Sequence, residues 1–380
     1  MTYPLLPYSQ LVFDMLKTQP DVYTYCLRVR VGKSNVDAER MRQAIRAALM
    51  NHPIFRMVVD EQGMQYFDAN ADPMHGQYSN MDIREDDTYL YIDYRFHRIL
   101  GDAISENILL EDFVRAYQGL PLAPDNYLAY LQQTEEHKHS KRYADDRQWL
   151  EEHFGAIQCP VHPKADVSLS TEATTEGTWA EDYSDLREAL NQLSSEWLIT
   201  PTAFFSLAAA LAMTEYNGTD EAALTWAYEG RETEDEQRIY GSLHRDIPFM
   251  ISRKSKDEHH KQASRNELLR QTRKAMREGI ARSCYPFTLT APHNELWNYA
   301  LNVLVQPTSE AIAAAVPFEY DVLPTEQSDK AYALLDVEIY DSTALTVVYR
   351  YSAAHYKEES VRKFAGLVRK YAEWLLKDEK

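Results

Sequence analysis

The stretch TYLYIDYRFHRILGDAISENILLEDFVRAY, residues Thr88–Tyr117, predicts a strand, a short turn and a helix. In its first part the residues alternate with a period of two, which places one apolar set on one strand face: Leu90, Ile92, Tyr94 and Phe96. The other face is polar, and it either lines a cavity or faces water: Tyr91, Asp93, Arg95 and His97. After Gly101-Asp102 the apolar residues follow helical spacing until Gly119, a residue typical of helix ends.

Strands and helices also alternate on both sides of this stretch. Upstream, we expect a short helix from Ser9, a helix opened by Asp37, and strands at 23–31, 55–60 and 64–68. Downstream, we expect strands at 222–228, 299–305, 335–339 and 345–351, and helices at 127–154, 203–216, 264–280 and the C-terminal end. Segment 155–177 contains Pro160, Pro163 and a Ser/Thr cluster with little periodicity. It therefore predicts a boundary between two α/β lobes, 1–160 and 175–380, as expected for a chain of 380 residues.

Composition and missing motifs disfavour several protein classes. The net charge of −19 and the lack of a basic stripe argue against a nucleic-acid binder. The chain contains no Gly-rich phosphate loop, no H-E-x-x-H and no paired C-x-x-C, which disfavours nucleotide-binding folds and zinc hydrolases, so we expect no metal. The N-terminus lacks a targeting signal, no apolar run reaches the length of a span, and the three cysteines are scattered. We therefore expect a cytoplasmic protein with free thiols and no membrane association.

Five segments, in this order along the chain, resemble nonribosomal peptide synthetase condensation domains. They are YPLLPYSQ (Tyr3–Gln10), VDAERMRQAIRAALMNHPIFRMVV (Val36–Val59), ITPTAFFSLAAALAMTEYNGTDEAALTWAYEGR (Ile199–Arg231), IYGSLHRDIPF (Ile239–Phe249) and LLDVEIYDSTALTVVYRYS (Leu334–Ser352). The resemblance spans nearly the whole chain. It implies an α/β fold of two chloramphenicol-acetyltransferase-like lobes arranged in a V. It further implies a tunnel that carrier-bound donor and acceptor enter from opposite faces.

The family signature H-H-x-x-x-D-G matches HRILGDA, residues His97–Ala103. The first His and the Asp are kept as His97 and Asp102, whereas the second His is Arg98 and the Gly is Ala103. Another register aligns Phe96-His97 with the His pair, but it then exchanges Gly101 and Asp102. We prefer the first register because it also leaves Ser105 two residues later, as is common in the family.

The arginine changes what the motif can do. In the family the second His is credited with assisting amine attack on a thioester, as a base or by positioning. A guanidinium, with a pKa above ~12, cannot accept that proton. Arg98 could instead donate hydrogen bonds to a developing oxyanion or bind a carboxylate or phosphate. His97 and Arg98 are the candidate catalytic residues, although the resemblance implies that the first His is mainly architectural. It also implies that Asp102 holds the turn through an arginine. Arg231 is the candidate partner of Asp102 or of the acidic segment Glu232–Glu236.

Other polar residues are weaker candidates. Ser105, His244 and Asn302 are predicted to contact substrate, although Ser105 is more often a residue of the helix start. Arg245-Asp246 stands where the family has Asn-Thr, and it either reshapes the tunnel floor or forms a local ion pair. The pair His259-His260 is interpreted as a solvated face. Basic residues on the predicted helix 264–280 either contact an acidic carrier protein or are solvated: Arg265, Arg270, Arg273, Lys274 and Arg277.

Two functions remain open. The first is an acyltransferase that joins a carrier- or CoA-bound acyl group to an amine or alcohol. The second is a non-catalytic module that recruits another enzyme, as the X domain of glycopeptide synthetases does with a similar H-R-x-x-x-D pattern. An epimerase-like relative is a third idea, which Arg98 weakens equally. We expect no bound cofactor, and a phosphopantetheine-linked acyl substrate on a separate carrier protein, or CoA, with a carrier protein or biosynthetic enzyme as partner in trans.

Overall fold

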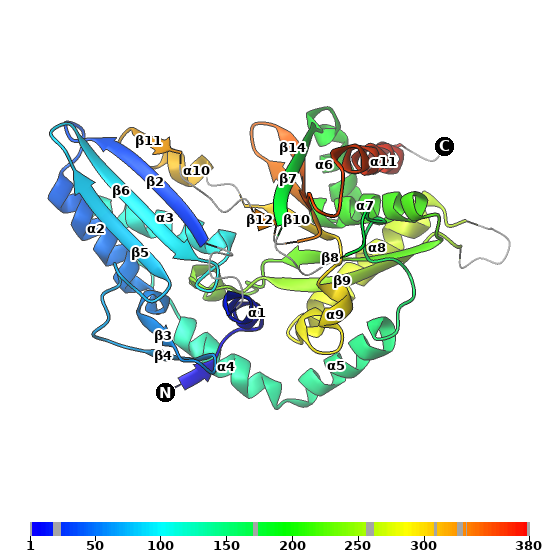
Figure 1. Cartoon of the computed structure of the whole chain (residues 1–380), viewed down its shortest axis with the longest axis horizontal. Helices are drawn as coiled ribbons and strands as arrows, with labels where there is room; N and C mark the ends of the chain where they lie inside the picture. The colour runs from blue at the N-terminus through cyan, green and yellow to red at the C-terminus, as the bar shows by residue number, and fades with distance from the viewer. Residues whose placement is uncertain are drawn as a thin grey trace. The chain divides into compact units, whose positions relative to one another are not determined.

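The computed structural model describes residues 2–17, 24–169, 174–255, 262–307, 310–324, 330–331 and 333–377 (Figure 1). Its contacts divide the chain into two compact units. Unit 1 contains Met1–His139, Glu229–His244 and Pro307–Ser328, and unit 2 contains Ser140–Tyr228, Arg245–Gln306 and Asp329–Lys380. Both units therefore combine segments that are distant in the sequence.

Unit 1 is built on a four-stranded antiparallel sheet. Its strand order is β11-β2-β6-β5, with bounds Tyr320–Leu323, Thr24–Gly32, Tyr89–His97 and Ser79–Glu85. In β6 the predicted apolar face is the buried one, with Leu90, Tyr94 and Phe96 in the core. Two helices pack against each other behind this sheet in Figure 1, α2 (Ala38–Asn51) and α3 (Ala103–Gln118).

Smaller elements complete unit 1. A three-stranded sheet has the order β1-β4-β3, with bounds Thr2–Pro4, Met64–Phe67 and Met57–Val59. The helical elements are α1 (Pro7–Leu16), η1 (Pro53–Arg56), α4 (Tyr127–Lys138), η3 (Glu236–Arg238) and α10 (Glu310–Ala314). Asp37 caps α2 by accepting hydrogen bonds from the N–H groups of Glu39 and Arg40, as the sequence predicts.

Unit 2 is built on a seven-stranded mixed sheet of order β12-β7-β14-β13-β10-β8-β9. The bounds, in that order, are Lys330–Ala331, Thr174–Asp182, Leu345–Ser352, Leu335–Asp341, Asn302–Gln306, Glu221–Tyr228 and Arg245–Ser252. Strand β10 is internal and parallel to both neighbours, and it begins three residues after the start of the predicted strand 299–305. The helical elements are α5 (Lys141–Phe154), η2 (Ser184–Leu186), α6 (Arg187–Trp197), α7 (Pro201–Asn217), α8 (Arg265–Arg282), η4 (Phe287–Leu289), α9 (Asn294–Trp297) and α11 (Glu358–Leu376).

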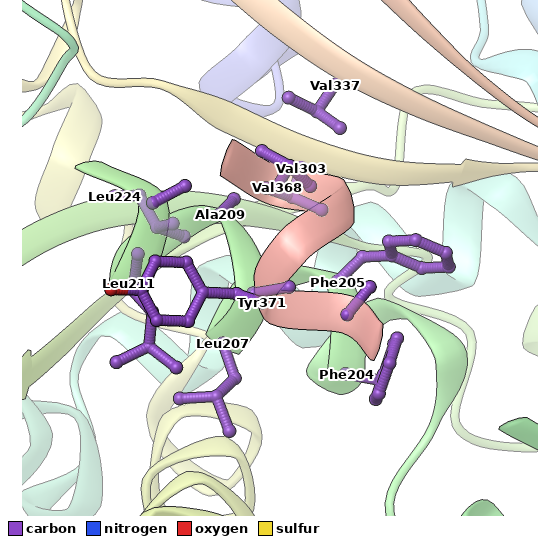
Figure 2. Packing of buried hydrophobic residues seen from close by; sticks show 14 of the residues in the cluster. Phe204, Phe205, Leu207, Ala209, Leu211, Leu224, Val303, Val337, Val368 and Tyr371 are labelled. Carbon is purple, nitrogen blue, oxygen red and sulfur yellow. The ribbon is translucent and has the colours of Figure 1, made fainter. Parts of the chain in front are cut away.

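The core of unit 2 surrounds helix α7. This helix starts at the Thr200 cap and ends at Gly218 in the left-handed region, and every residue from Ala203 to Thr214 is buried. Figure 2 shows its side chains meeting apolar residues of β8, β10, β13 and α11, among them Leu224, Val303, Val337 and Val368. A helix that is apolar on all sides is thus explained by burial on all sides.

Some expectations on the elements need correction. The helical stretch predicted over 127–154 is two helices, because the Ser140 side chain caps a new helix by accepting from Tyr143 N–H. Strand β7 begins inside the segment predicted as a linker, and β5 and β9 were not predicted. The predicted boundaries 1–160 and 175–380 do not coincide with the compact units, because α5 packs on α8 while Glu229–His244 packs in unit 1.

In the part of the chain that the structure describes, no single helix has the length and apolarity needed to cross a membrane. Two consecutive helical segments, Ser184–Trp197 and Pro201–Asn217, reach that length and composition only together, and they are bent by 104°.

Candidate active site at the turn after strand β6

The turn that leaves β6 is closed by His97. Its backbone N–H donates to the carbonyl of Tyr78 at 2.9 Å, and its carbonyl accepts from Leu100 N–H at 3.0 Å. Its ring nitrogen Nδ1 accepts from Ile99 N–H at 3.3 Å, and the residue is buried. These contacts give His97 a place in the architecture of the turn.

Gly101 lets the turn approach helix α3 closely. A Cβ at this position would lie 2.8 Å from Cε1 of Tyr240 and 2.9 Å from Cβ of Ser105. Because real Cβ atoms do not come this close, the turn needs glycine here.

Asp102 follows as the N-cap of α3 and is the centre of a buried hydrogen-bond network. Its Oδ1 accepts from Ser105 N–H at 3.0 Å, and Ser105 Oγ bonds back to the Asp102 N–H at 3.2 Å, forming a capping box. The Arg231 guanidinium binds the carboxylate with two parallel bonds of 2.9 and 3.0 Å. The two side chains are 5% and 1% exposed. A buried two-pronged pair of this kind fixes geometry as well as charge.

The segment Glu229–His244 is anchored on the same carboxylate. The N–H groups of Leu243 and His244 donate to Asp102 Oδ2 at 3.0 and 3.3 Å. Ser105 Oγ donates to the Gly241 carbonyl at 2.9 Å, and Arg231 donates to the carbonyls of Ile239 and Gly241. Burial acts to raise the pKa of Asp102, but attraction to Arg231 outweighs it and lowers this pKa to about 2. The carboxylate therefore remains charged at neutral pH.

Arg98 lies partly buried over the ring of Tyr25, with its guanidinium carbon 5.5 Å from the ring centre. Burial opposes its charge, while Tyr25, Tyr8, Glu106 and Asp102 favour it, and the net effect raises the pKa of Arg98. Among the described residues, the guanidinium has no hydrogen-bond or ion-pair partner.

His244 contributes a neutral imidazole to the same turn. Its ring meets the ring of Tyr8 edge-on, with centres 3.9 Å apart. Burial lowers the pKa of His244 to about 4, with the positive charges of Arg98 and Arg231 adding to the effect and Asp102 opposing it.

Glu106 is a residue of this site that the sequence reasoning missed. It stands four positions after Asp102 in α3, and its carboxylate interacts electrostatically with Arg98 and Asp102. It also acts on the hydroxyls of Tyr94 and Tyr240, which lie 3.2 Å apart. Its spacing from Asp102 was no signal, because Asp102 is the N-cap of α3 and has an extended backbone rather than a helical one.

The structure thus brings together six of the predicted site residues within unit 1: His97, Arg98, Asp102, Ser105, Arg231 and His244. Asn302 is elsewhere, on β10 of unit 2, where its Oδ1 lies 3.3 Å from Thr225 Oγ1. Of the Arg245-Asp246 pair, Arg245 donates to Ser283 Oγ at 2.8 Å. Within the described residues, no group of three or more His, Cys, Asp or Glu side chains is arranged to hold a metal ion.

The other surface expectations have different outcomes. Arg265 is buried and donates to the Leu375 carbonyl, so it is not available to a carrier protein. The pair His259-His260 lies outside the described residues. The polar face of β6 does border a hollow of about 680 Å³, which is lined by Asp93 and Arg95 together with Cys26, Leu27, Arg28, Asn80, Asp82, Arg84, Tyr94 and Pro324.

Comparison with known proteins places this geometry in context. The family model described as "Condensation domain" matches residues 64–378. No curated protein matches the chain. The epimerization domain from the third module of tyrocidine synthetase B is 15% identical, with 99% of this chain and 96% of that chain covered and a TM-score of 0.74. The EpoB cyclization-docking bidomain from Sorangium cellulosum is 13% identical, with 100% of this chain and 85% of that chain covered and a TM-score of 0.77. The X-domain in the complex with OxyB from teicoplanin biosynthesis is 15% identical, with 98% of this chain and 92% of that chain covered and a TM-score of 0.74. These likenesses confirm the expected two-lobed, acetyltransferase-like fold.

Proposed function

Because the chain belongs to the condensation-domain family, we propose that it transfers an acyl group from a thioester to an amine or an alcohol. The donor is a phosphopantetheine-linked acyl group on a separate carrier protein, or acyl-CoA. The proposal rests on the turn between β6 and α3, where the motif position next to His97 presents a guanidinium.

The observation that carries the proposal is that the Arg98 guanidinium has no hydrogen-bond or ion-pair partner among the described residues. The Asp102–Arg231 ion pair and the capping box of Ser105 hold the end of the turn in place, which restricts the backbone at Arg98. The side chain itself packs on Tyr25 and keeps its donors free of protein partners among the described residues. Preorganised, unpaired donors are what a site needs in order to bind a charge that appears only during reaction.

In acyl transfer that charge is the oxyanion of the tetrahedral intermediate. As the nucleophile attacks the thioester carbonyl, negative charge develops on the carbonyl oxygen, and Arg98 N–H groups donate to it. Removing one such donor typically lowers the rate by roughly 10²–10³-fold. The role needs a hydrogen-bond donor that keeps its proton, which arginine supplies together with a positive charge, and it does not need a group that titrates.

The test is acyl transfer by wild type and by Arg98→Gln. Donors are acyl-CoA thioesters and acyl groups loaded on a holo carrier protein, the acceptor is a primary amine, and the amide product is measured by mass spectrometry. We expect turnover by wild type and a loss of roughly 10²-fold or more in Arg98→Gln, mainly in the catalytic rate rather than in the Michaelis constant.

Arg95→Gln is the matched control, because Arg95 is exposed on the polar face of β6, three residues before Arg98. We expect it to keep the wild-type rate. An equal loss of rate in both variants would assign the effect to surface charge. Absence of amide product from the wild type with every donor would exclude this acyl transfer.

A second candidate is a module that recruits another enzyme. It is favoured by the arginine in place of the second histidine and by the likeness to an X-domain solved in complex with OxyB. A catalytically silent chain that binds a biosynthetic enzyme, with affinity unchanged by Arg98→Gln, would support this candidate over the acyltransferase.

A further inference from the structure

The segment Glu229–His244 is attached to the rest of unit 1 at a second place besides Asp102. There the imidazole of His52, at the end of α2, lies between two carboxylates. Its Nδ1 is 2.7 Å from Asp125 Oδ2, and its Nε2 is 3.3 Å from Asp112 Oδ2. The three side chains are at most 1% exposed. The acyl transfer proposed above gives these buried groups no task.

The geometry of this cluster requires His52 to be a cation. A carboxylate oxygen faces each ring nitrogen, and an ionised carboxylate only accepts hydrogen bonds. A neutral imidazole has one N–H, so its other nitrogen would point a lone pair at a carboxylate, whereas imidazolium has an N–H for each. Burial opposes the charge, but the contacts with Asp112 and Asp125 outweigh it and raise the pKa of His52 above its usual 6.5.

The anchored segment supplies the second cation of the cluster. Arg238 donates to Asp112 Oδ1 at 2.5 Å and to Glu111 at 2.8 Å. His52 and Arg238 thus balance the two buried carboxylates, while Glu111 is 43% exposed and is partly solvated. A buried group of charges balanced in this way is sensitive to the loss of any one of them.

Tyr240 connects this cluster to the anchored segment. Asp125 Oδ2, the atom that contacts His52, also accepts a hydrogen bond from Tyr240 N–H at 3.0 Å. The Tyr240 ring packs against the rings of His52 and Phe55, with centres 5.4 and 4.8 Å away. The cluster therefore fixes both the backbone and the ring of Tyr240.

The same tyrosine supports the turn that carries Arg98. Its Cε1 lies so close to Gly101 that a Cβ there would be 2.8 Å away, and its hydroxyl is 3.2 Å from the Tyr94 hydroxyl of β6. Gly101 is three residues after Arg98 in the turn. The turn is thus held by Asp102 at its end and by Tyr240 along its backbone, so a shift of Tyr240 moves the backbone beside Arg98.

We propose that His52 is a positioning residue: as an imidazolium between Asp112 and Asp125, it holds Tyr240 against the turn. It thereby sets where the Arg98 N–H groups lie during reaction. The inference rests on the proposed acyl transfer and adds the group that supports Arg98 from inside unit 1. A misplacement of about 1 Å caused by a change away from the chemistry can lower a rate by roughly 10²-fold.

The first test compares wild type and His52→Gln in acyl transfer from acyl-CoA to an aromatic amine, which stays neutral between about pH 6 and 9. We expect kcat to fall by roughly 10- to 100-fold in the variant, with the Michaelis constant of the donor little changed. In wild type kcat should decrease as the pH rises through the raised pKa of His52, because the imidazolium is lost. In His52→Gln this alkaline decrease should be absent, whereas a merely structural role would lower the rate without removing it.

His355→Gln is the matched control, because His355 is also buried but belongs to unit 2. It should keep the wild-type kcat and pH profile, which separates the loss of a buried imidazole as such from the loss of this one. Circular dichroism at the assay temperature shows that each variant is folded.

Asp125→Asn is a second variant, which keeps the shape of the side chain and removes one charge beside His52. Here the alkaline decrease should move to lower pH, since one of the two carboxylates that favour the imidazolium is gone. Nitrogen-15 NMR of histidine-labelled wild type measures the charge without any turnover, and we expect both His52 ring nitrogens to carry protons at neutral pH.

A neutral His52 ring at neutral pH would overturn the inference. So would a folded His52→Gln variant with the wild-type kcat and pH profile, and that result would leave the proposed acyl transfer standing. Absence of amide product from wild type would overturn the acyl transfer itself and, with it, the positioning role.

Discussion

At the scale of single residues, the turn after β6 is held mainly by the Asp102 carboxylate. This carboxylate binds Arg231, accepts the capping hydrogen bond from Ser105 N–H at the start of α3, and accepts a hydrogen bond from Leu243 N–H in the segment Glu229–His244. Breaking a buried ion pair by removing one charge leaves the partner charge uncompensated in a poorly solvated place. An exposed pair has little of this effect, because water screens it.

Asp102→Asn should therefore lower the free energy of unfolding by roughly 3–5 kcal/mol, since Arg231 loses its counter-charge. The control Asp93→Asn removes a carboxylate that pairs with Arg28 and Arg84 on the exposed sheet face, and it should change stability by about 0–1 kcal/mol. Urea unfolding followed by circular dichroism measures both. Equal effects of the two substitutions would contradict a supporting role for Asp102.

His244 gives the folded protein a defined acid sensitivity. Burial lowers its pKa from 6.5 to about 4, so the folded state stays neutral at pH values where the unfolded chain binds a proton. Its contribution to stability is complete above 6.5 and is lost as the pH falls through 4. His244→Gln should therefore lose less stability than wild type between these two pH values.

The comparison is read from urea midpoints near pH 7 and pH 4.5, with His139→Gln as a control that changes an exposed imidazole at the end of α4. Parallel curves for wild type and His244→Gln would show that the imidazole is solvated in the folded state.

At the scale of elements, helix starts and helix ends were predictable because residues next to each other in the sequence decide them. Asp37, Thr200 and Ser264 each cap the predicted helix through their own side chains, and Gly119 and Gly218 end helices in the left-handed region. Strand β7 was not predictable, because its pairing with β14 is specified by a partner about 170 residues away in sequence. Glu106 was missed for a similar reason: its significance comes from Arg98, Tyr94 and Tyr240 in space.

The close packing between the turn and α3 can be tested with a single methyl group. Gly101→Ala should destabilise the protein by roughly 1–3 kcal/mol, because the added Cβ would overlap Tyr240 and Ser105. In Gly366→Ala, on the exposed side of α11 with nothing within 4 Å, the same change should stabilise by about 0.5–1 kcal/mol through helix propensity. Thermal unfolding distinguishes them, and a neutral Gly101→Ala would show that the turn is looser than described.

At the scale of the whole molecule, the site is assembled from segments distant along the chain. Arg231 and the anchored segment Glu229–His244 belong to unit 1, although more than a hundred residues separate them from Asp102, and β11 pairs with the edge of β2. Sequence order suggested a lobe ending near residue 160, whereas the contacts show that this stretch alone lacks the counter-charge of Asp102. We expect that a fragment of residues 1–160 does not fold by itself. A cooperative urea transition of the isolated fragment would refute this.

The most direct test of the central claim restores the family motif. The account holds that a permanent cation at Arg98 takes the place of a titratable histidine. Wild type and Arg98→His should be compared in one amide-forming assay with the same carrier-bound donor. We predict that wild type turns over and that Arg98→His is slower, because it loses the cation at neutral pH. A silent wild type and an active Arg98→His variant would contradict the account.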